Sequence, residues 1–156
     1  MKFSALLTAI CLATCSFEAQ GVKAASATQS DQIVWMTDFE QAKALAKAES
    51  KPLFVDFSGS DWCPHCKNLD KEILKTAEFE QALGQKMIFV VIDFPRYREL
   101  DPKVKKQNEE LAKAYQVRGF PTVLIFDSDM NKIGSLGYMS GGPQPFIKKV
   151  EAIIAK

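Results

Sequence analysis

Two cysteines and the only histidine of the chain stand within one short motif, Cys63-Pro64-His65-Cys66. When such a motif opens a helix its two thiols lie one turn apart, and the free backbone N–H groups of the helix N-terminus favour a thiolate on the first cysteine. A neighbouring imidazole stabilises that thiolate when charged, or through its N–H group when neutral. The motif therefore predicts thiol–disulfide exchange, with an exposed Cys63 as the attacking thiolate and a more buried Cys66 resolving the mixed disulfide.

Other chemistries fit the motif poorly. A structural zinc site needs four ligands, and no histidine or cysteine follows Cys66. Covalent haem attachment needs a histidine directly after the second cysteine, where Lys67 stands. A Gly-x-Gly-x-x-Gly nucleotide fingerprint is also missing. We therefore expect no metal and no cofactor, and electrons should arrive by exchange with the dithiol of a partner protein.

The first 24 residues have the features of an export signal. A basic start is followed by an apolar run that ends at Cys15 and is short for a membrane span. Small residues offer cleavage after Ala24, which we prefer, or after Ala27. An alternative is a lipoprotein signal, in which Cys15 would carry a lipid and tether the protein to a membrane, although Thr14 fits that signal poorly.

Removal of the export signal leaves only two cysteines in a nearly neutral protein. Cleavage after Ala24 leaves Cys63 and Cys66 as the only thiols. Structural disulfides of exported proteins usually close long loops, and a four-residue loop restricts the unfolded chain very little. With 20 basic and 19 acidic residues interspersed, nothing indicates nucleic-acid binding, and a monomer is the default.

Hydrophobic periodicity predicts alternating strands and helices after a flexible lead-in at residues 25–32. A capping box, Thr37-x-x-Glu40, marks the start of the first helix, and Val104, Leu111, Ala114 and Tyr115 should face the core from a later one. The expected strands are 33–36, 53–57, 87–94, 121–126 and 132–136, and the expected helices are 38–49, 63–74, 76–83, one opening at 101 and one around 146–154. This order predicts an α/β domain at residues 33–156, with a central mixed β-sheet flanked by helices on both faces.

Asp56 is unexpected inside the apolar strand 53–57. Either the strand turns its alternate face to water, or the carboxyl group is buried and serves as a proton acceptor. The sequence leaves both interpretations open.

Residues 33–156 resemble the thioredoxin family. Two motifs carry the resemblance: Cys63-Pro64-His65-Cys66 after a strand, and Gly119-Phe120-Pro121-Thr122 before the next-to-last strand. The resemblance implies a cis peptide bond at Pro121, packed opposite the disulfide. It also implies that Trp62, Phe120 and Pro121 bind the substrate peptide. The acid of the thioredoxin strand stands six positions before the first cysteine, whereas Asp56 stands seven before Cys63.

The residues that precede the motif, Ser58-Gly59-Ser60-Asp61-Trp62, make the chain most similar to periplasmic oxidoreductases of the DsbH type. This implies a periplasmic reductase that acts on disulfide-containing proteins and is recharged by a membrane partner of the DsbD kind. The Pro64-His65 pair is shared with DsbA and favours an oxidant instead, but the chain has no room for the helical insertion of DsbA. A third alternative is a peptide-binding chaperone module with an incidental disulfide, whose groove Trp62, Phe120 and Tyr138 would form.

Overall fold

The computed structural model describes residues 32–155. The expected signal peptide, the alternative lipid anchor at Cys15 and nearly all of the lead-in lie outside these residues. The strands are β1 (Trp35–Met36), β2 (Leu53–Ser58), β3 (Ile88–Asp93), β4 (Thr122–Phe126) and β5 (Lys132–Leu136). The helices are α1 (Phe39–Glu49), α2 (Pro64–Leu69), the π-helix η1 (Asp70–Leu74), α3 (Ala77–Leu83), α4 (Pro102–Ala114) and α5 (Pro143–Ile154).

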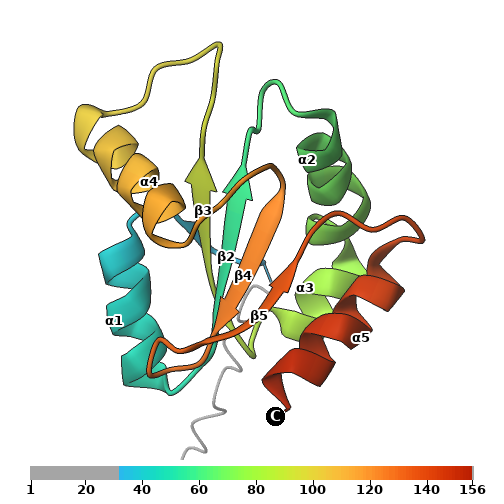
Figure 1. The fold of residues 1–156 in the computed structure, drawn as a ribbon. Helices are drawn as coiled ribbons and strands as arrows, with labels where there is room; N and C mark the ends of the chain where they lie inside the picture. The colour runs from blue at the N-terminus through green and yellow to red at the C-terminus, as the bar shows by residue number, and fades with distance from the viewer. Residues whose placement is uncertain (1–31, 156) are drawn as a thin grey trace, which may run out of the picture.

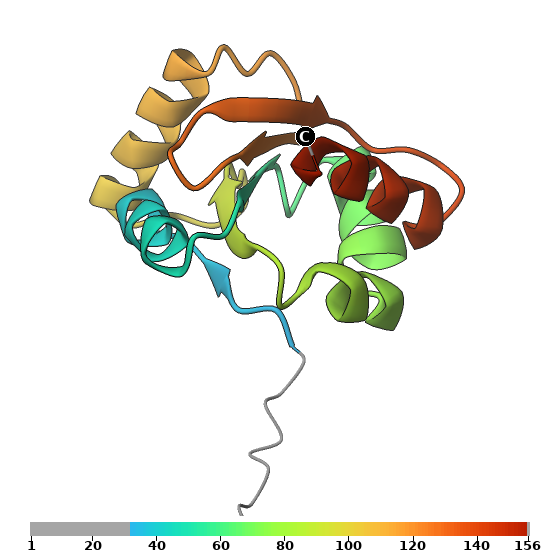
Figure 2. The ribbon, with the colours of Figure 1, turned by 90° about the horizontal axis from the view of Figure 1, so that it is seen from below.

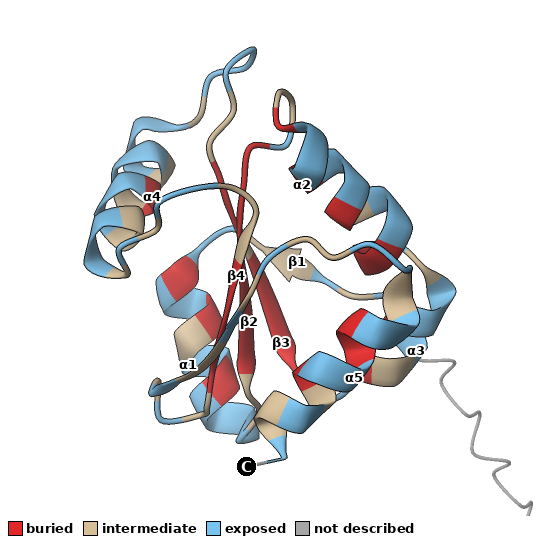
Figure 3. Ribbon diagram, turned by 45° about the vertical axis from the view of Figure 1, so that its right-hand side comes forward, coloured by how far each residue is buried: buried red, intermediate tan, exposed pale blue. Residues whose placement is uncertain are grey.

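The five strands form one mixed sheet in the order β1-β3-β2-β4-β5. Strands β1, β3 and β2 run parallel, while β4 is antiparallel to β2 and β5 to β4. All six residues of the central strand β2 are buried, because the sheet is covered on both sides (Figure 3). The predicted α/β architecture with a central mixed sheet is confirmed.

Helices cover both faces of this sheet and create two apolar cores. Helices α1 and α4 lie on one face, and α2, α3 and α5 lie on the other (Figures 1 and 2). Successive residues of a strand point to opposite faces, so Phe54 enters the core under α3 and α5, while Val55 enters the core under α1. The alternation explains why a continuous apolar run was needed at β2.

Three segments meet at one end of the sheet. Because β2 and β3 are parallel, the loops that follow them lie at the same end (Figure 1). Strand β4 runs the opposite way, so its first residue, Thr122, reaches that end as well. The cysteine motif after β2, the loop after β3 and the residues before β4 are thereby brought together.

Side-chain caps fix where the helices begin, and one of them differs from the sequence prediction. The N-cap of α1 is Asp38, whose carboxylate accepts a hydrogen bond from the Gln41 backbone N–H at 2.9 Å. The predicted capping box at Thr37 was therefore wrong, since an aspartate one residue later caps the helix equally well. Asp101 caps α4 as its sequence predicted, accepting from the Lys103 N–H at 2.8 Å with Pro102 as the first helical residue.

The core-facing side of α4 also differs from the prediction. Ala114 is exposed, and the one buried residue of this helix is Asn108, with 2% of its surface accessible. The Asn108 amide donates a hydrogen bond of 2.8 Å to the backbone oxygen of Asp93 at the end of β3. An asparagine can occupy this buried position because its polar group is satisfied there.

Within residues 32–155, the helices are all too short or too polar to cross a lipid bilayer.

Candidate redox-active site

Cys63 and Cys66 form a disulfide at the N-terminus of α2, with 5.3 Å between their Cα atoms. Cys63 is the N-cap residue, and its Sγ accepts a hydrogen bond from the Cys66 backbone N–H at 3.2 Å. Pro64 is exposed and occupies the first helical position, where the backbone N–H that proline lacks would have no helical partner. The motif therefore places the first sulfur at the helix N-terminus, where a backbone N–H of the first turn donates to it.

Both cysteines are buried in this disulfide form. Cys63 is 5% accessible and Cys66 is 2% accessible, so Cys66 is the more buried of the two, as expected. The expectation of an exposed Cys63 was wrong. The segment before β4 explains this, because the backbone oxygen of Phe120 lies 3.6 Å from the Cys63 Sγ. The Phe120 backbone thus lies directly beside the Cys63 sulfur.

The peptide bond between Phe120 and Pro121 is cis. This bond lies directly before β4, and the Phe120 oxygen beside it is 3.6 Å from the Cys63 sulfur. The Thr122 hydroxyl donates to the Gly119 backbone oxygen at 2.8 Å and closes the turn around the two residues. The Phe120 backbone is consequently held next to the reactive sulfur.

The turn between β2 and α2 packs tightly against the disulfide. The Gly59 backbone N–H lies 3.4 Å from the Cys66 Sγ and donates to it, while the Gly59 oxygen accepts from the Cys63 N–H at 2.8 Å. A Cβ atom on Gly59 would lie only 2.7 Å from the Trp62 ring atom Cε2. Glycine is required here because the indole occupies the space beside its Cα atom.

Two carboxylates hold this turn to the loop after β3. Asp93, 6% accessible, accepts from the Ser60 backbone N–H at 2.9 Å and from the Ser60 hydroxyl at 2.7 Å, and it forms an ion pair with Arg98. Asp61 accepts from the backbone N–H groups of Arg96, at 3.0 Å, and Tyr97, at 2.8 Å. Sequence reasoning missed Asp93, although a carboxylate at the end of an apolar strand was a signal of the same kind as Asp56.

Trp62, Phe94 and Phe120 form a continuous aromatic surface beside the disulfide, here termed the aromatic shelf. The Trp62 ring meets Phe120 edge-on at 6.0 Å between centroids, and Phe120 stacks on Phe94 at 5.0 Å. The indole N–H donates to the Phe94 backbone oxygen at 2.7 Å, and the Arg96 guanidinium lies 3.7 Å from the indole centroid. Trp62 and Phe120 were singled out from the sequence, but Phe94 was not.

His65 is exposed on α2. Its imidazole stacks on the ring of Tyr138, and the Tyr138 hydroxyl donates a hydrogen bond of 2.6 Å to Glu72. This hydrogen bond to a carboxylate raises the pKa of Tyr138 above its usual value. Tyr138 therefore belongs to the immediate surroundings of His65.

Asp56 is buried in the centre of β2, with 5% of its surface accessible. It follows Phe54 by two residues, so its side chain points to the sheet face that α2, α3 and α5 cover. Its Oδ1 has no hydrogen-bond partner among the described residues, and burial, with the negative charges of Asp70 and Asp93, raises its pKa to about 7. The water-facing interpretation of this residue was wrong, because both faces of the strand are covered.

The described residues, 32–155, contain no group of three or more histidine, cysteine, aspartate or glutamate side chains arranged to hold a metal ion.

The chain is similar to known thiol–disulfide exchange proteins. DsbH, named a disulfide bond reductase in Chlamydia pneumoniae, is 29% identical over 116 residues, which cover 74% of this chain and 70% of that protein. DsbD of Salmonella paratyphi A, named a thiol:disulfide interchange protein, is 35% identical over 92 residues, or 57% of this chain and 14% of DsbD. A solved structure titled DsbH oxidoreductase superimposes with a TM-score of 0.75 at 28% identity, covering 80% of this chain and 85% of that one.

The family described as thioredoxin-like domain matches residues 39–153, which include the cysteine motif, the cis proline and all helices and strands except β1 and the last residue of α5. Together with the mixed sheet and the disulfide at the start of α2, this match shows that the chain belongs to the thioredoxin-like domain family.

Proposed function

We propose that the protein is an exported thiol–disulfide oxidoreductase that reduces disulfides in protein substrates through Cys63 and Cys66. The observation that carries the proposal is the position of the disulfide, which lies at a helix N-terminus beside a cis proline and an aromatic shelf. The names of the similar proteins, a disulfide bond reductase and a thiol:disulfide interchange protein, support the same activity.

The reduced form starts the reaction. The Cys63 thiolate attacks one sulfur of a substrate disulfide, forms a mixed disulfide and releases the other substrate sulfur as a thiolate. Cys66 then loses its proton and attacks the Cys63 sulfur, which releases the second substrate thiolate and forms the Cys63–Cys66 disulfide. Two electrons pass to the substrate, and the disulfide form of the enzyme is the product.

Backbone groups of the site favour each step. The N–H groups at the start of α2 stabilise negative charge on Cys63, and the Gly59 N–H does so for Cys66. The edge of the Phe120–Pro121 segment, adjacent to the Cys63 sulfur, offers backbone groups to which an extended substrate peptide can hydrogen-bond. Substrate and sulfur are thereby brought into line.

Asp56 is proposed as the proton acceptor for Cys66. Its side chain lies on the sheet face covered by α2, the helix that carries Cys66, and its pKa of about 7 matches the pH at which a general base works best. The unpartnered Oδ1 leaves one oxygen available for the proton.

The direction of electron flow is proposed from the similar proteins. We favour a periplasmic reductase, recharged by a membrane dithiol donor of the DsbD kind, because DsbH is named a reductase. His65 favours an oxidant instead, because a group that stabilises the Cys63 thiolate stabilises the reduced form and makes the enzyme more oxidising. The two influences make the redox potential the decisive quantity.

The test is the equilibrium potential of the protein in glutathione buffers, with the state of the two cysteines measured by thiol alkylation. A value at or below about −230 mV supports the reductase, whereas a value near about −120 mV contradicts it and indicates an oxidant. Cys66→Ser should trap mixed disulfides with substrate proteins, and Cys63→Ser should abolish exchange. A Cys63→Ser variant that binds the same substrates as strongly as the native protein would instead favour the peptide-binding module.

A further inference from the structure

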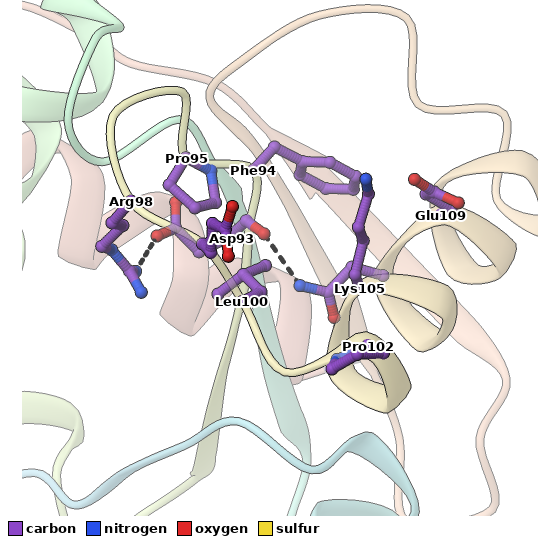
Figure 4. A pocket seen from close by; sticks show the side chains of 10 residues that line it. Asp93, Phe94, Pro95, Arg98, Leu100, Pro102, Lys105 and Glu109 are labelled. Atoms are coloured by element: carbon purple, nitrogen blue, oxygen red, sulfur yellow. Dashed lines mark hydrogen bonds and ion pairs between the residues drawn. The ribbon is translucent and has the colours of Figure 1, made fainter.

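A cavity of about 460 Å³ opens between the loop after β3 and the first turns of α4 (Figure 4). Its wall is apolar where Phe94, Pro95, Leu100 and Pro102 line it. Its size lies in the range of cavities that bind small molecules or side chains, which is about 300–1,000 Å³. The proposed exchange chemistry does not use this cavity.

The cavity shares one residue, Phe94, with the aromatic shelf. Phe94 lines the cavity, and its ring stacks on Phe120, whose backbone oxygen lies 3.6 Å from the Cys63 sulfur. The Phe94 backbone oxygen also accepts the Trp62 indole N–H. A polypeptide that reaches Cys63 across the aromatic shelf therefore passes Phe94, a residue of the cavity wall.

The cavity is preformed, because both of its walls are fixed by hydrogen bonds. Asp93 binds Ser60 on the turn before the motif, Arg98 on the loop and, through its backbone oxygen, Asn108 on α4. Asp61 holds the loop a second time through two backbone N–H groups. A preformed cavity loses little conformational entropy when it is filled, which favours binding.

The charged residues at the cavity rim do not favour a ligand of either charge. In Figure 4 Lys105 rises from α4 alongside the Phe94 ring, and Glu109 lies on the next turn of the same helix. Glu99 adds a second carboxylate, and the Arg98 charge is compensated by Asp93. Apolar contact and shape must therefore provide the selectivity of this cavity.

We propose that this cavity binds a bulky apolar side chain, such as phenylalanine or leucine, of the polypeptide that is in exchange with Cys63. This inference rests on the proposed function and adds a substrate class to it: proteins whose cysteine is flanked by such a side chain. Small disulfides, which are too short to span the aromatic shelf, gain nothing from the cavity.

The experiment measures how fast the reduced protein reacts with two kinds of disulfide. One is a panel of cystine-linked peptides in which a single phenylalanine is moved one position at a time along either side of the cysteine, with an all-serine parent. The other is 2-hydroxyethyl disulfide. At one or two positions phenylalanine should raise the second-order rate constant about tenfold over the parent, from burial of its ring.

Two variants close the cavity from different walls. Leu100→Asp places a carboxylate in the apolar wall, and Glu109→Trp fills the mouth from α4. Both should lose most of the tenfold gain, while the rate with 2-hydroxyethyl disulfide and the redox potential stay within about twofold and a few millivolts of the native protein. The matched control is Glu110→Trp, because Glu110 is the neighbouring residue on α4, lies beside Lys106 and does not line the cavity.

The outcomes separate the two proposals. If the native protein fails to react even with 2-hydroxyethyl disulfide, the proposed function is wrong. If it reacts, but no phenylalanine position accelerates exchange or both variants keep the gain, the substrate cavity is wrong. If Leu100→Asp or Glu109→Trp instead changes the sedimentation of a self-associating native protein, the cavity is an interface between two copies, which also overturns the proposal.

Discussion

The imidazole of His65 stacks on the phenol ring of Tyr138, with 5.8 Å between the ring centroids and 27° between the ring planes. The contact joins the cysteine motif to the segment after β5, 73 positions further along the chain. The Tyr138 hydroxyl is in turn bound to Glu72. The imidazole orientation is therefore set by two segments outside the motif.

Replacing His65 by alanine should make the Cys63–Cys66 potential more negative by about 30 mV, which corresponds to about 1.4 kcal/mol. This shift follows from the expectation that His65 stabilises the Cys63 thiolate and thus the reduced form. Equilibration with glutathione measures the shift. Tyr138→Phe is the control, because it keeps the stacked ring and should leave the potential within about 10 mV. A potential that rises in His65→Ala would show that His65 does not support the thiolate.

Asp56 should make the stability of the disulfide form depend on pH. Its pKa is about 7 in the folded protein against 3.8 for an unperturbed aspartate, so folding stability falls as pH rises from about 4 to about 7 and changes little beyond. Below pH 4 both folded and unfolded states carry the proton. The loss is on the order of 4 kcal/mol, at about 1.4 kcal/mol for each pH unit.

Urea unfolding at a series of pH values, compared with Asp56→Asn, measures this contribution. The variant remains neutral, so the difference in free energy of unfolding between variant and native protein should grow from pH 4 to pH 7 and then level off. Parallel curves for the two proteins would show that Asp56 titrates normally when folded. In exchange assays, Asp56→Asn should also slow resolution of the mixed disulfide by Cys66.

Features that leave a pattern in adjacent residues could be predicted from the sequence. Strand β2 was predicted from a continuous apolar run, β5 with the bounds the structure shows, and α4 from Asp101-Pro102, because burial on both faces and helix capping each leave a pattern in adjacent residues. The cysteine motif was recognised in the same way. These features depend little on where the rest of the chain lies.

The site contacts that sequence reasoning missed all join distant segments. Asp93 binds Ser60 from 33 residues away, Asn108 satisfies a backbone oxygen 15 residues earlier, and Phe94 stacks on Phe120. Polar residues such as Asp93 and Asn108 are usually exposed, and only the arrangement of the strands shows that each finds a buried partner. The burial of Cys63 was missed for the same reason, since the Phe120 segment lies over it.

Ser60 and Asp93 should be energetically coupled. Ser60→Ala removes one hydrogen bond to a buried carboxylate and should lower the free energy of unfolding by about 1–2 kcal/mol, and Asp93→Asn by about 2–3 kcal/mol. In a double-mutant cycle, the stability loss of the double mutant should be about 1 kcal/mol smaller than the sum of the two single-mutant losses, because both substitutions remove the same contact. Asp129→Asn, at an exposed turn, is the control and should change stability by less than about 0.5 kcal/mol. Fully additive losses would show that the carboxylate does not hold the turn.

Gly59 should tolerate no side chain, whereas Gly119 should tolerate one. An added Cβ at Gly59 would lie 2.7 Å from the Trp62 ring, while at Gly119 it would meet no atom within 4 Å. Gly59→Ala must therefore displace an indole that is held by its bond to the Phe94 oxygen, and we expect a loss of about 1–3 kcal/mol of stability.

Trp62 fluorescence distinguishes this displacement from a general loss of stability. In folded Gly59→Ala the emission should shift, because the indole leaves the Phe94 oxygen, and exchange should slow as the aromatic shelf is disturbed. Gly119→Ala should keep the native spectrum and should match or exceed the native stability by up to about 1 kcal/mol, since alanine restricts the unfolded chain. If both variants behave alike, the space beside Gly59 does not position Trp62, and the aromatic shelf must be fixed by the bonds of Asp61 and Asp93 alone.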